Sequence, residues 1–287
     1  MGMVGTVGLV LHPRRDSKIA IDTIVEWAGQ RSATVLGLPE EILRIDCSAV
    51  PVNADTLIDR SDLLVSLGGD GTMLRTMRLV TGRPTPVLGV NLGRLGFLAE
   101  IDVEDLPRGL SVIDEHRYLV EPRMAVSTVL PDGSVHTAFN DIALVRIPGD
   151  GLAAVSIDVQ GHPFVRYAAD AVIVATSTGS TAYSFSAGGP IVSPTVEGFL
   201  VVPAAAHSAF NRALVLSADE EAALELLPSS GRLAVEVDGI VAGYVSAGDR
   251  LVINAIRAAA MVVRLGDTTF YERARRKLRV NGSLEVD

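Results

Sequence analysis

The hydrophobic pattern of the chain changes near Tyr118, and this change constrains the fold more than any other feature. Before it, continuous apolar runs typical of buried strands alternate with segments whose apolar residues recur at i, i+3, i+4 and i+7. After it, short strands of alternating polarity are separated by turn signals. The pattern predicts an α/β plus β protein, with an N-terminal parallel, Rossmann-like domain and a C-terminal antiparallel, β-sandwich-like domain.

The 287 residues are enough for two domains. We expect an α/β domain from residues 1–117 and 267–287, because Phe270, Ala274 and Leu278 recur every fourth position and predict a returning helix. Residues 118–266 are expected to form the β-rich domain. Strands are predicted over residues 4–11, 33–36, 62–67 and 86–90, and helices after Ser17, over 73–80 and over 103–116; residues 37–60 show no clear pattern.

Composition argues against several classes of function. The net charge of −9 is unfavourable for a general nucleic-acid binder, which needs a basic stripe. No run approaches the ~20 apolar residues that span a bilayer, so no membrane partner is expected. Cys47 is the only cysteine, which fits the reducing cytoplasm. The five histidines lack metal-ligand spacing, so we expect no metal held by the protein alone.

A glycine-rich turn, Gly68-Gly69-Asp70-Gly71-Thr72, follows the apolar run over residues 63–67. Its glycines allow close backbone approach, and its free amides can hold an anion such as phosphate. Asp70 would repel phosphate, so its carboxylate is expected to take a proton, hold a metal or bind a hydroxyl group. The combination indicates phosphoryl transfer to an alcohol. The alternative is a tight strand-to-helix turn in which Asp70 is the N-cap.

Other polar residues are predicted at the carboxyl edge of the same sheet, where ligands of parallel sheets collect. His12, Arg14 and Asn91 follow strands that neighbour the glycine turn in the chain. Arg14 is placed to reach donor phosphates from the end of the first strand. A solvated arginine with no such role is the alternative.

A second polar cluster follows the predicted strand over residues 171–175. Residues 176–180 offer hydroxyl groups and amides to a ligand, Tyr183 offers an aromatic face to a base, and Ser186 adds a polar contact. Upstream, Asn140 and Asp141 lie in an apolar, strand-like segment, where polar side chains are costly unless they are satisfied or used. The density of these groups predicts a nucleotide site, although helix capping explains part of the serine and threonine content.

These motifs resemble those of the NAD kinases. The glycine-aspartate turn alone is shared with diacylglycerol and sphingosine kinases and with phosphofructokinases, whereas the segment over residues 178–183 with its Gly-Gly-Pro continuation is specific. The resemblance covers most of the chain from about residue 60 to Leu278. Its motifs are residues 68–72, Leu95-Gly96-Phe97-Leu98, Asn140-Asp141, residues 178–183, residues 186–190, residues 203–207 and Arg212.

The resemblance implies a kinase that transfers the γ-phosphoryl group of ATP, or of polyphosphate, to the 2′-hydroxyl of the adenosine ribose of NAD, giving NADP. It implies NAD bound between the two domains, Mg²⁺ bound with ATP, and a homodimer or homotetramer. Asp70 would be the acid–base residue. The donor phosphates are assigned to Gly68, Gly69, Gly71 and Thr72, with Arg14 added from its position. The contacts to NAD are assigned to Phe97, Asn140, Asp141, Asp170, Thr178, Thr181, Ala182, Tyr183, Ser186 and His207.

The chain departs from the family pattern near the acceptor residues. Asp141 stands where NAD kinases usually carry Glu, Ala171 where they carry Gly, and Ser177 and Ala213 where they carry Pro. The shorter carboxylate leaves one alternative open, a related enzyme that phosphorylates another nucleoside or adenosine-type acceptor. A nucleotide-binding regulator that has lost catalysis is a further alternative, against which the intact Asp70 argues.

Overall fold

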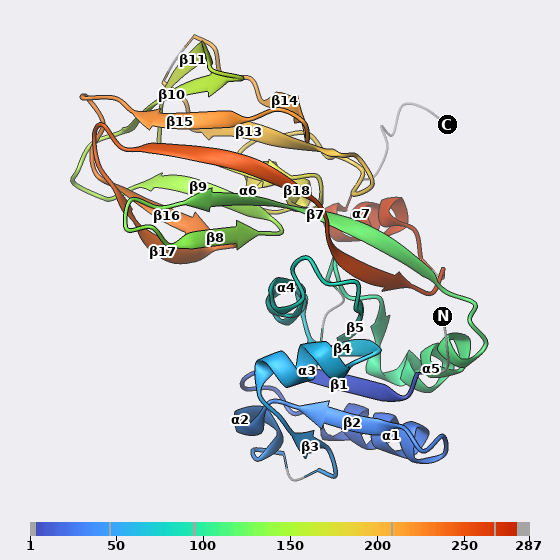
Figure 1. Ribbon diagram of the computed structural model, residues 1–287. Helices are drawn as coiled ribbons and strands as arrows, with labels where there is room; N and C mark the ends of the chain where they lie inside the picture. Colours follow the sequence, from blue (N-terminus) through green and yellow to red (C-terminus); the bar gives the residue numbers. More distant parts are fainter. Residues whose placement is uncertain (1–3, 46, 94–95, 208, 267, 280–287) are drawn as a thin grey trace, which may run out of the picture. The chain divides into compact units, whose positions relative to one another are not determined.

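The computed structural model describes residues 4–45, 47–93, 96–207, 209–266 and 268–279 (Figure 1). Leu95 of the family motif, and residues 267 and 280–287 of the expected first domain, lie outside the described residues. The chain divides into two compact units, which we call unit 1 (Met1–Pro122 with Ala260–Asp287) and unit 2 (Arg123–Ala259). It passes from unit 1 to unit 2 within strand β7 (Leu119–Val129) and returns within β18 (Arg250–Arg264).

Unit 1 is built on a parallel sheet with the strand order β3-β2-β1-β4-β5. Strand β6 and the end of β18 also pair with β5 in parallel. The central strands are buried along nearly their whole length, as expected for parallel strands with helices on both faces. The strands are β1 (Thr6–Leu11), β2 (Thr34–Gly37), β3 (Val50–Pro51), β4 (Leu63–Gly68), β5 (Pro86–Asn91) and β6 (Ile101–Asp102).

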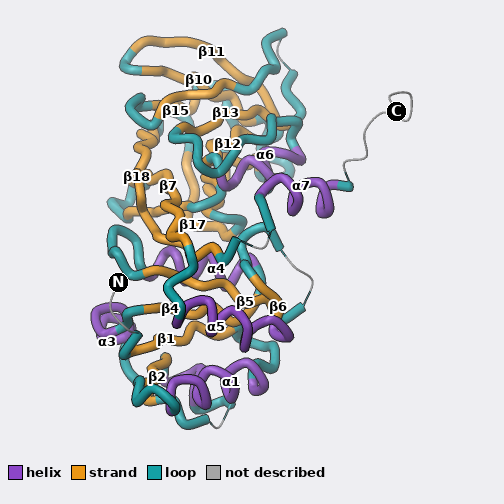
Figure 2. The backbone as a smooth tube through the Cα atoms, turned by 90° about the vertical axis from the view of Figure 1, so that its right-hand side faces the viewer, coloured by secondary structure: helices purple, strands orange, loops and turns teal. Residues whose placement is uncertain are grey.

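Helices pack on this sheet (Figures 1 and 2). Ile21, Ile24 and Ala28 of α1 (Lys18–Gly29) are buried, as its apolar stripe predicts, and α1 contacts α5 (Leu106–Asp114). The segment over residues 37–60, which has no clear sequence pattern, folds into short elements. The other helices are α2 (Pro39–Ile42), α3 (Ala54–Arg60), α4 (Asp70–Leu79), the 3-10 helix η1 (Val103–Asp105) and α7 (Phe270–Leu278).

Unit 2 contains two antiparallel sheets. In one the order is β11-β10-β15-β18, with β7 beside β18 and β8 beside β7; in the other it is β14-β13-β12-β9-β16-β17. One core cluster takes Val155 and Leu224 from the first sheet and Val172, Val201 and Val235 from the second. The remaining bounds are β8 (Val135–Ala138), β9 (Asp141–Arg146), β10 (Ala153–Val159), β11 (His162–Ala169), β12 (Ala171–Thr176), η2 (Thr178–Thr181), α6 (Tyr183–Ser186), β13 (Gly198–Ala204), β14 (Leu214–Ser217), β15 (Ala222–Leu226), β16 (Leu233–Val237) and β17 (Ile240–Val245).

The predicted fold class is therefore confirmed: a parallel α/β unit and a unit of two packed antiparallel sheets. The returning C-terminal helix is present as α7, and it belongs to unit 1. Over the described ranges, none of the helices is both long and apolar enough to cross a membrane.

Candidate functional site

The glycine turn joins β4 directly to α4. Strand β4 ends at Gly68, Gly69 is the N-cap residue in an extended conformation, and Asp70 is the first residue of the helix. The alternative in which Asp70 is the N-cap is therefore wrong. The carboxylate does not cap its own helix, and its hydrogen bonds go elsewhere.

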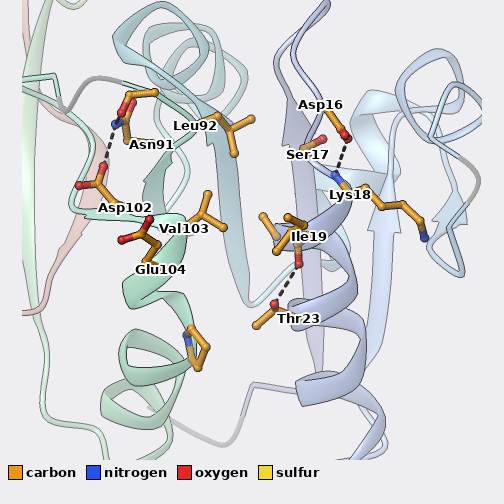
Figure 3. A pocket seen from close by; sticks show the side chains of 13 residues that line it. Asp16, Ser17, Lys18, Ile19, Thr23, Asn91, Leu92, Asp102, Val103 and Glu104 are labelled. Atoms are coloured by element: carbon orange, nitrogen blue, oxygen red, sulfur yellow. Dashed lines mark hydrogen bonds between the residues drawn. The ribbon is translucent and has the colours of Figure 1, made fainter.

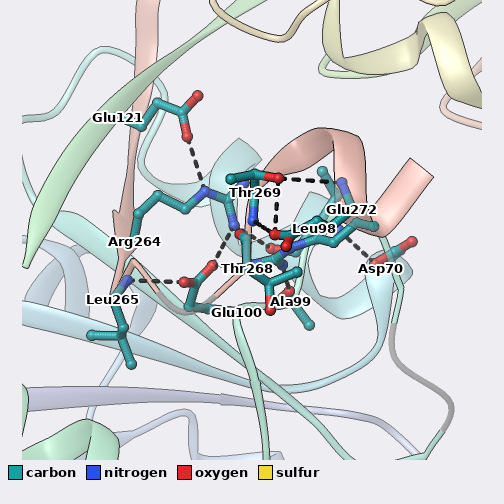
Figure 4. Close-up of polar contacts among 11 residues, drawn as sticks. Asp70, Leu98, Ala99, Glu100, Glu121, Arg264, Leu265, Thr268, Thr269 and Glu272 are labelled. Atoms are coloured by element: carbon teal, nitrogen blue, oxygen red, sulfur yellow. Dashed lines mark hydrogen bonds and ion pairs between the residues drawn. The ribbon is translucent and has the colours of Figure 1, made fainter. Parts of the chain in front are cut away.

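A second loop holds the Asp70 carboxylate (Figure 4). The amide of Phe97 donates to Oδ2 at 2.9 Å, and the amide of Leu98 donates to Oδ1 at 3.0 Å. Each oxygen keeps a lone pair that a substrate hydroxyl could use. The two amides fix the position and orientation of a carboxylate that remains partly accessible. That is the arrangement a general base needs.

The Asp70 carboxylate occupies the space that a side chain at position 96 would fill, and Gly96 keeps this space free. A Cβ atom at this position would come within 1.9 Å of Asp70 Oδ1. Gly96→Ala should therefore displace the carboxylate or the loop by about 1 Å and lower kcat about 10²-fold, the scale expected for such a displacement of a catalytic group. Gly29→Ala is the matched control, because a Cβ atom there meets nothing within 4 Å. Equal initial rates for the two variants would contradict this account.

The remaining residues of the glycine turn differ in accessibility. Gly71 is exposed, whereas Thr72 is buried and its Oγ1 has no hydrogen-bond partner in the described part of the chain. A Cβ atom at Gly68 would come within 2.0 Å of Thr72 Oγ1, so this glycine is needed where strand and helix meet. Arg14 is exposed, in the segment that follows β1, and its amide donates to His12 Nδ1 at 3.1 Å.

The predicted carboxyl edge of the sheet is also present. The His12 amide donates to the carbonyl of Leu67 at 2.8 Å, and Asn91 lies opposite Gly68 in the β4–β5 pair. The Asn91 side chain donates to Asp102 Oδ1 at 2.7 Å. These contacts place the ends of β1, β4 and β5 side by side.

A cavity of about 680 Å³ lies next to this edge (Figure 3). Its lining comes from the first turn of α1, the residues that follow β5, and the segment that leads into α5. The charged groups in the lining are three carboxylates and one lysine, so the local field favours a neutral or cationic group over a polyphosphate. They are Asp16, Asp102, Glu104 and Lys18.

In unit 2, Asn140 and Asp141 lie at the start of β9, and Asp238 holds their backbone. The Asp238 carboxylate accepts amide hydrogen bonds from Phe139 at 3.3 Å, from Asn140 at 2.7 Å and from Asp141 at 3.2 Å. The Asp238 amide in turn donates to the Asp141 carbonyl at 2.9 Å. An Asp-Gly pair such as Asp238-Gly239 is a turn signal in the sequence, but this role follows only from the pairing of β16 with β9.

Asp141 is a buried acid beside another acid. Burial, and then the charge of Asp238, raise the pKa of Asp141 to about 7. The backbone amide of Tyr183 donates to the carboxylate and partly offsets this rise. Near neutral pH the side chain therefore exists in both forms, and can either donate to a ligand hydroxyl or accept from it.

The hydroxyl-rich segment packs against Asn140. Thr176 Oγ1 donates to the Phe139 carbonyl at 2.5 Å and accepts from the Gly179 amide at 2.9 Å. A Cβ atom at Gly179 would come within 2.0 Å of the Asn140 carbonyl oxygen, so only glycine allows this approach. Thr178, Thr181 and Ala182 lie in or just after η2, and Tyr183 and Ser186 form the ends of the short helix α6.

Tyr183 lies within electrostatic range of two other predicted site residues, Asp141 and Asp170. Burial raises the pKa of its hydroxyl, and the charges of Glu236, Asp141 and Asp170 raise it further. Asp170 also pairs with Arg146 at 2.6 Å. His207 is exposed, and its amide donates to the Ala168 carbonyl at 2.7 Å.

The residues of the site offer few ligands for a metal ion. In the ranges that the structure describes, no group of three or more His, Cys, Asp or Glu side chains is placed to hold one. Both oxygens of Asp70 already accept amide hydrogens. A Mg²⁺ ion fits here only as a companion of phosphates and water, which is its usual way of binding at phosphoryl-transfer sites.

The sequence and the fold both match known proteins. Residues 48–118 match the model of the ATP-NAD kinase N-terminal domain, and residues 139–265 match that of the ATP-NAD kinase C-terminal domain. The chain is 36% identical to NAD kinase 1 of Streptomyces avermitilis, over 96% of this chain and 87% of that protein. It is 34% identical to the NAD kinase of Desulforamulus reducens, over 96% of this chain and 98% of that protein.

Two solved structures share the fold. Yeast NADH kinase complexed with NADH superposes with a TM-score of 0.83 at 28% identity, over 99% of this chain and 90% of that one. An NAD kinase from Archaeoglobus fulgidus in complex with ATP gives a TM-score of 0.73 at 26% identity, over 96% of this chain and all of that one. The fold and the glycine-aspartate turn define a kinase that acts on an alcohol group. The chain belongs to the NAD kinase family.

Proposed function

We propose that this enzyme transfers the γ-phosphoryl group of ATP to the 2′-hydroxyl of the adenosine ribose of NAD, giving NADP. The observation that carries the proposal is Asp70, a carboxylate at the first position of α4 that two loop amides hold in place. Relatives that match nearly the whole chain are NAD kinases, and a structural neighbour was solved with ATP bound.

Asp70 takes the proton of the ribose 2′-hydroxyl as its oxygen bonds to the γ-phosphorus, while the bond from that phosphorus to the β–γ bridging oxygen breaks and ADP leaves. The donor phosphates bind at Gly68, Gly69, Gly71 and Thr72, where the N-terminus of α4 favours an anion, and exposed Arg14 adds a positive charge. Polyphosphate would use the same groups as an alternative donor. The cavity beside α1 is too acidic in its lining to be the phosphate site.

The groups of unit 2 bind the adenosine part of NAD. Asn140 and Asp141 supply hydrogen bonds to the ribose, and Tyr183 supplies an aromatic face. The other residues assigned to NAD are Phe97, Asp170, Thr178, Thr181, Ala182, Ser186 and His207. Mg²⁺ bound together with ATP would neutralise charge on the phosphates.

The test is a phosphoryl-transfer assay with ATP and Mg²⁺ against NAD, NADH, adenosine and other nucleosides, with products resolved by mass. We expect NADP from NAD, and none from the Asp70→Asn variant. A phosphorylated nucleoside with NAD untouched would keep the chemistry and replace the acceptor. Absence of any product would favour the alternative of a nucleotide-binding regulator that has lost catalysis.

Asp141 is the residue that favours the second candidate, a relative with another adenosine-type acceptor. Its side chain is buried, and the Tyr183 amide fixes its carboxylate at the present length. Asp141→Glu adds a methylene group to a packed site, so we expect KM for NAD to rise about fivefold while KM for ATP is unchanged. A lower KM for NAD would instead mean that aspartate falls short of this acceptor.

The setting of the enzyme completes the proposal. Cys47 is a free cysteine, in keeping with a cytoplasmic enzyme. We further propose a homodimer or homotetramer, as the family resemblance implies. Light scattering of the purified enzyme would give its mass, and a monomer at micromolar concentration would contradict this part.

A further inference from the structure

Behind the loop that holds Asp70 lies a network of four charged side chains in unit 1 (Figure 4). Glu100 Oε2 pairs with Arg264 Nη1 at 2.8 Å and with Arg273 Nη2 at 2.5 Å. Glu121 pairs with Arg264 Nε at 2.9 Å, so two arginines balance two carboxylates. The side chains of Glu100 and Arg273 are only 1% and 3% exposed.

The network binds the backbone of the same loop. Arg273 Nη1 donates to the Ala99 carbonyl, and Arg264 Nη1 lies 3.5 Å from the Leu98 carbonyl. The Glu100 amide donates to the Gly89 carbonyl of β5 at 2.8 Å, which ties the end of the loop to the sheet. The loop therefore donates two amide hydrogens to Asp70, from Phe97 and Leu98, and its Leu98 and Ala99 carbonyls face the two arginines.

Helix α7 is placed so that Arg273 reaches this loop. A capping box begins the helix: Thr269 Oγ1 accepts from the Glu272 amide, and the Glu272 carboxylate accepts from the Thr269 amide at 2.7 Å. Arg273 is the next residue and turns inward, while Arg275 and Arg276 after it are exposed. The C-terminal segment thus supplies one buried cation to a loop more than 170 residues earlier in the chain.

Stability alone is a weak reason for such a network. Burying charged groups costs desolvation, and apolar side chains of the same volume often stabilise a protein as well. Burial also lowers the pKa of Arg273, although the charge of Glu100 opposes this. What the network specifies is geometry, because the planar guanidinium fork fixes a carboxylate and a carbonyl at the same time.

We propose that Arg273, together with Glu100, is a positioning residue for Asp70: it holds the loop over residues 97–100 so that the Phe97 and Leu98 amides orient the carboxylate. The inference rests on the proposed role of Asp70 as general base. It assigns to the C-terminal helix a function in catalysis, exerted through the backbone and without contact with substrate.

Arg273→Lys keeps the charge but loses the fork. We expect kcat to fall about tenfold, with KM for NAD and for ATP changed less than twofold. Arg31→Lys is the matched control, because the Arg31 side chain in unit 1 pairs with Asp114 and donates to the Trp27 carbonyl, neither of which belongs to the loop over residues 97–100. Arg264→Lys alters the other arginine contact of Glu100, from β18, and is also expected to lower kcat. This second variant tests the inference if Arg273→Lys does not fold.

The decisive measurement is the double variant Asp70→Asn with Arg273→Lys. If Arg273 acts through Asp70, the second substitution has no further effect on the residual rate, whereas independent effects multiply. In parallel, hydrogen exchange of the peptide containing the Phe97 and Leu98 amides should quicken in Arg273→Lys while a peptide from β12 is unchanged.

The outcomes separate the two ideas. Unchanged kcat in both Arg273→Lys and Arg264→Lys, or multiplying effects in the double variant, would overturn the inference and leave the proposed function standing. An Asp70→Asn variant as active as the wild type would overturn the role of Asp70, and the inference with it.

Discussion

Asp70→Asn is expected to lower turnover of NAD with ATP by ~10²-fold or more, the scale of a positioned general base. The amide side chain has no basic oxygen to take the ribose proton. It also has only one acceptor oxygen for two donors, the Phe97 and Leu98 amides, so one loop amide loses its partner. Binding of NAD should change little, because its assigned contacts lie mainly in unit 2. Single-turnover rates and titration of NAD would measure the two effects separately.

Asp62→Asn is the matched control for this variant. Asp62 also accepts two backbone amides, from Gly5 and Thr6, each at 2.9 Å, and it lies at the opposite end of β4 from the glycine turn. A single oxygen takes both bonds, so asparagine can keep them. Its turnover should equal that of the wild type. Turnover of Asp70→Asn within about threefold of this control would remove Asp70 from the mechanism, given the expected scale.

Local pattern was enough to predict the frame of the site. The apolar run before Gly68, the glycines and the helical spacing after them predict a strand, a tight turn and a helix, and β4, Gly69 and α4 confirm that order. The Asp-Gly pair at Asp238 likewise predicts the hairpin between β16 and β17. These features depend on residues that are neighbours in the chain, so they can be predicted from the local sequence.

Partners far apart in the chain were not predictable in this way. Asp70 bonds to amides 27 and 28 positions later, Asp238 to amides almost 100 positions earlier, and Arg273 to Glu100 across 173 positions. The periodicity of the sequence does not indicate such pairs, because they form only once the strands are ordered in the sheets and α7 packs back onto unit 1. The pKa of Asp141 depends on the same kind of contact.

The secondary structure of residues 37–60 could not be predicted from the sequence for a related reason. Its helices are short, and α2 is fixed by a tertiary contact instead of an apolar stripe. Glu41 is buried, accepts the Leu11 amide at 2.6 Å and pairs with Arg75 at 2.5 Å. A glutamate that holds the end of β1 looks in sequence like any solvated one.

Asp141→Asn is expected to increase the stability of the protein at pH 8 and to leave it unchanged near pH 3. The folded pKa of Asp141 is about 7 and its ordinary value is 3.8, so between these values the folded state holds a proton that the unfolded state has lost. Stability must then fall as pH rises through this window, by at most ~1.4 kcal/mol per pH unit, and the loss is complete above pH 7. Asparagine does not ionise, and its side-chain oxygen can still accept the Tyr183 amide. The gain at pH 8 is up to about 4 kcal/mol for a shift of about three units.

Urea unfolding at pH 4, 6 and 8 measures this effect, with the wild type losing stability across the series relative to Asp141→Asn. Asp219→Asn is the control, because Arg257 lowers the pKa of that exposed carboxyl, and its titration falls below the window. Its curve should run parallel to that of the wild type from pH 4 to 8. If Asp141→Asn also runs parallel, the folded pKa of the carboxyl lies near its ordinary value of 3.8, and the group is ionised at neutral pH. In that case it acts on the acceptor only as a hydrogen-bond acceptor, and a pH dependence of KM for NAD near pH 7 would need another source.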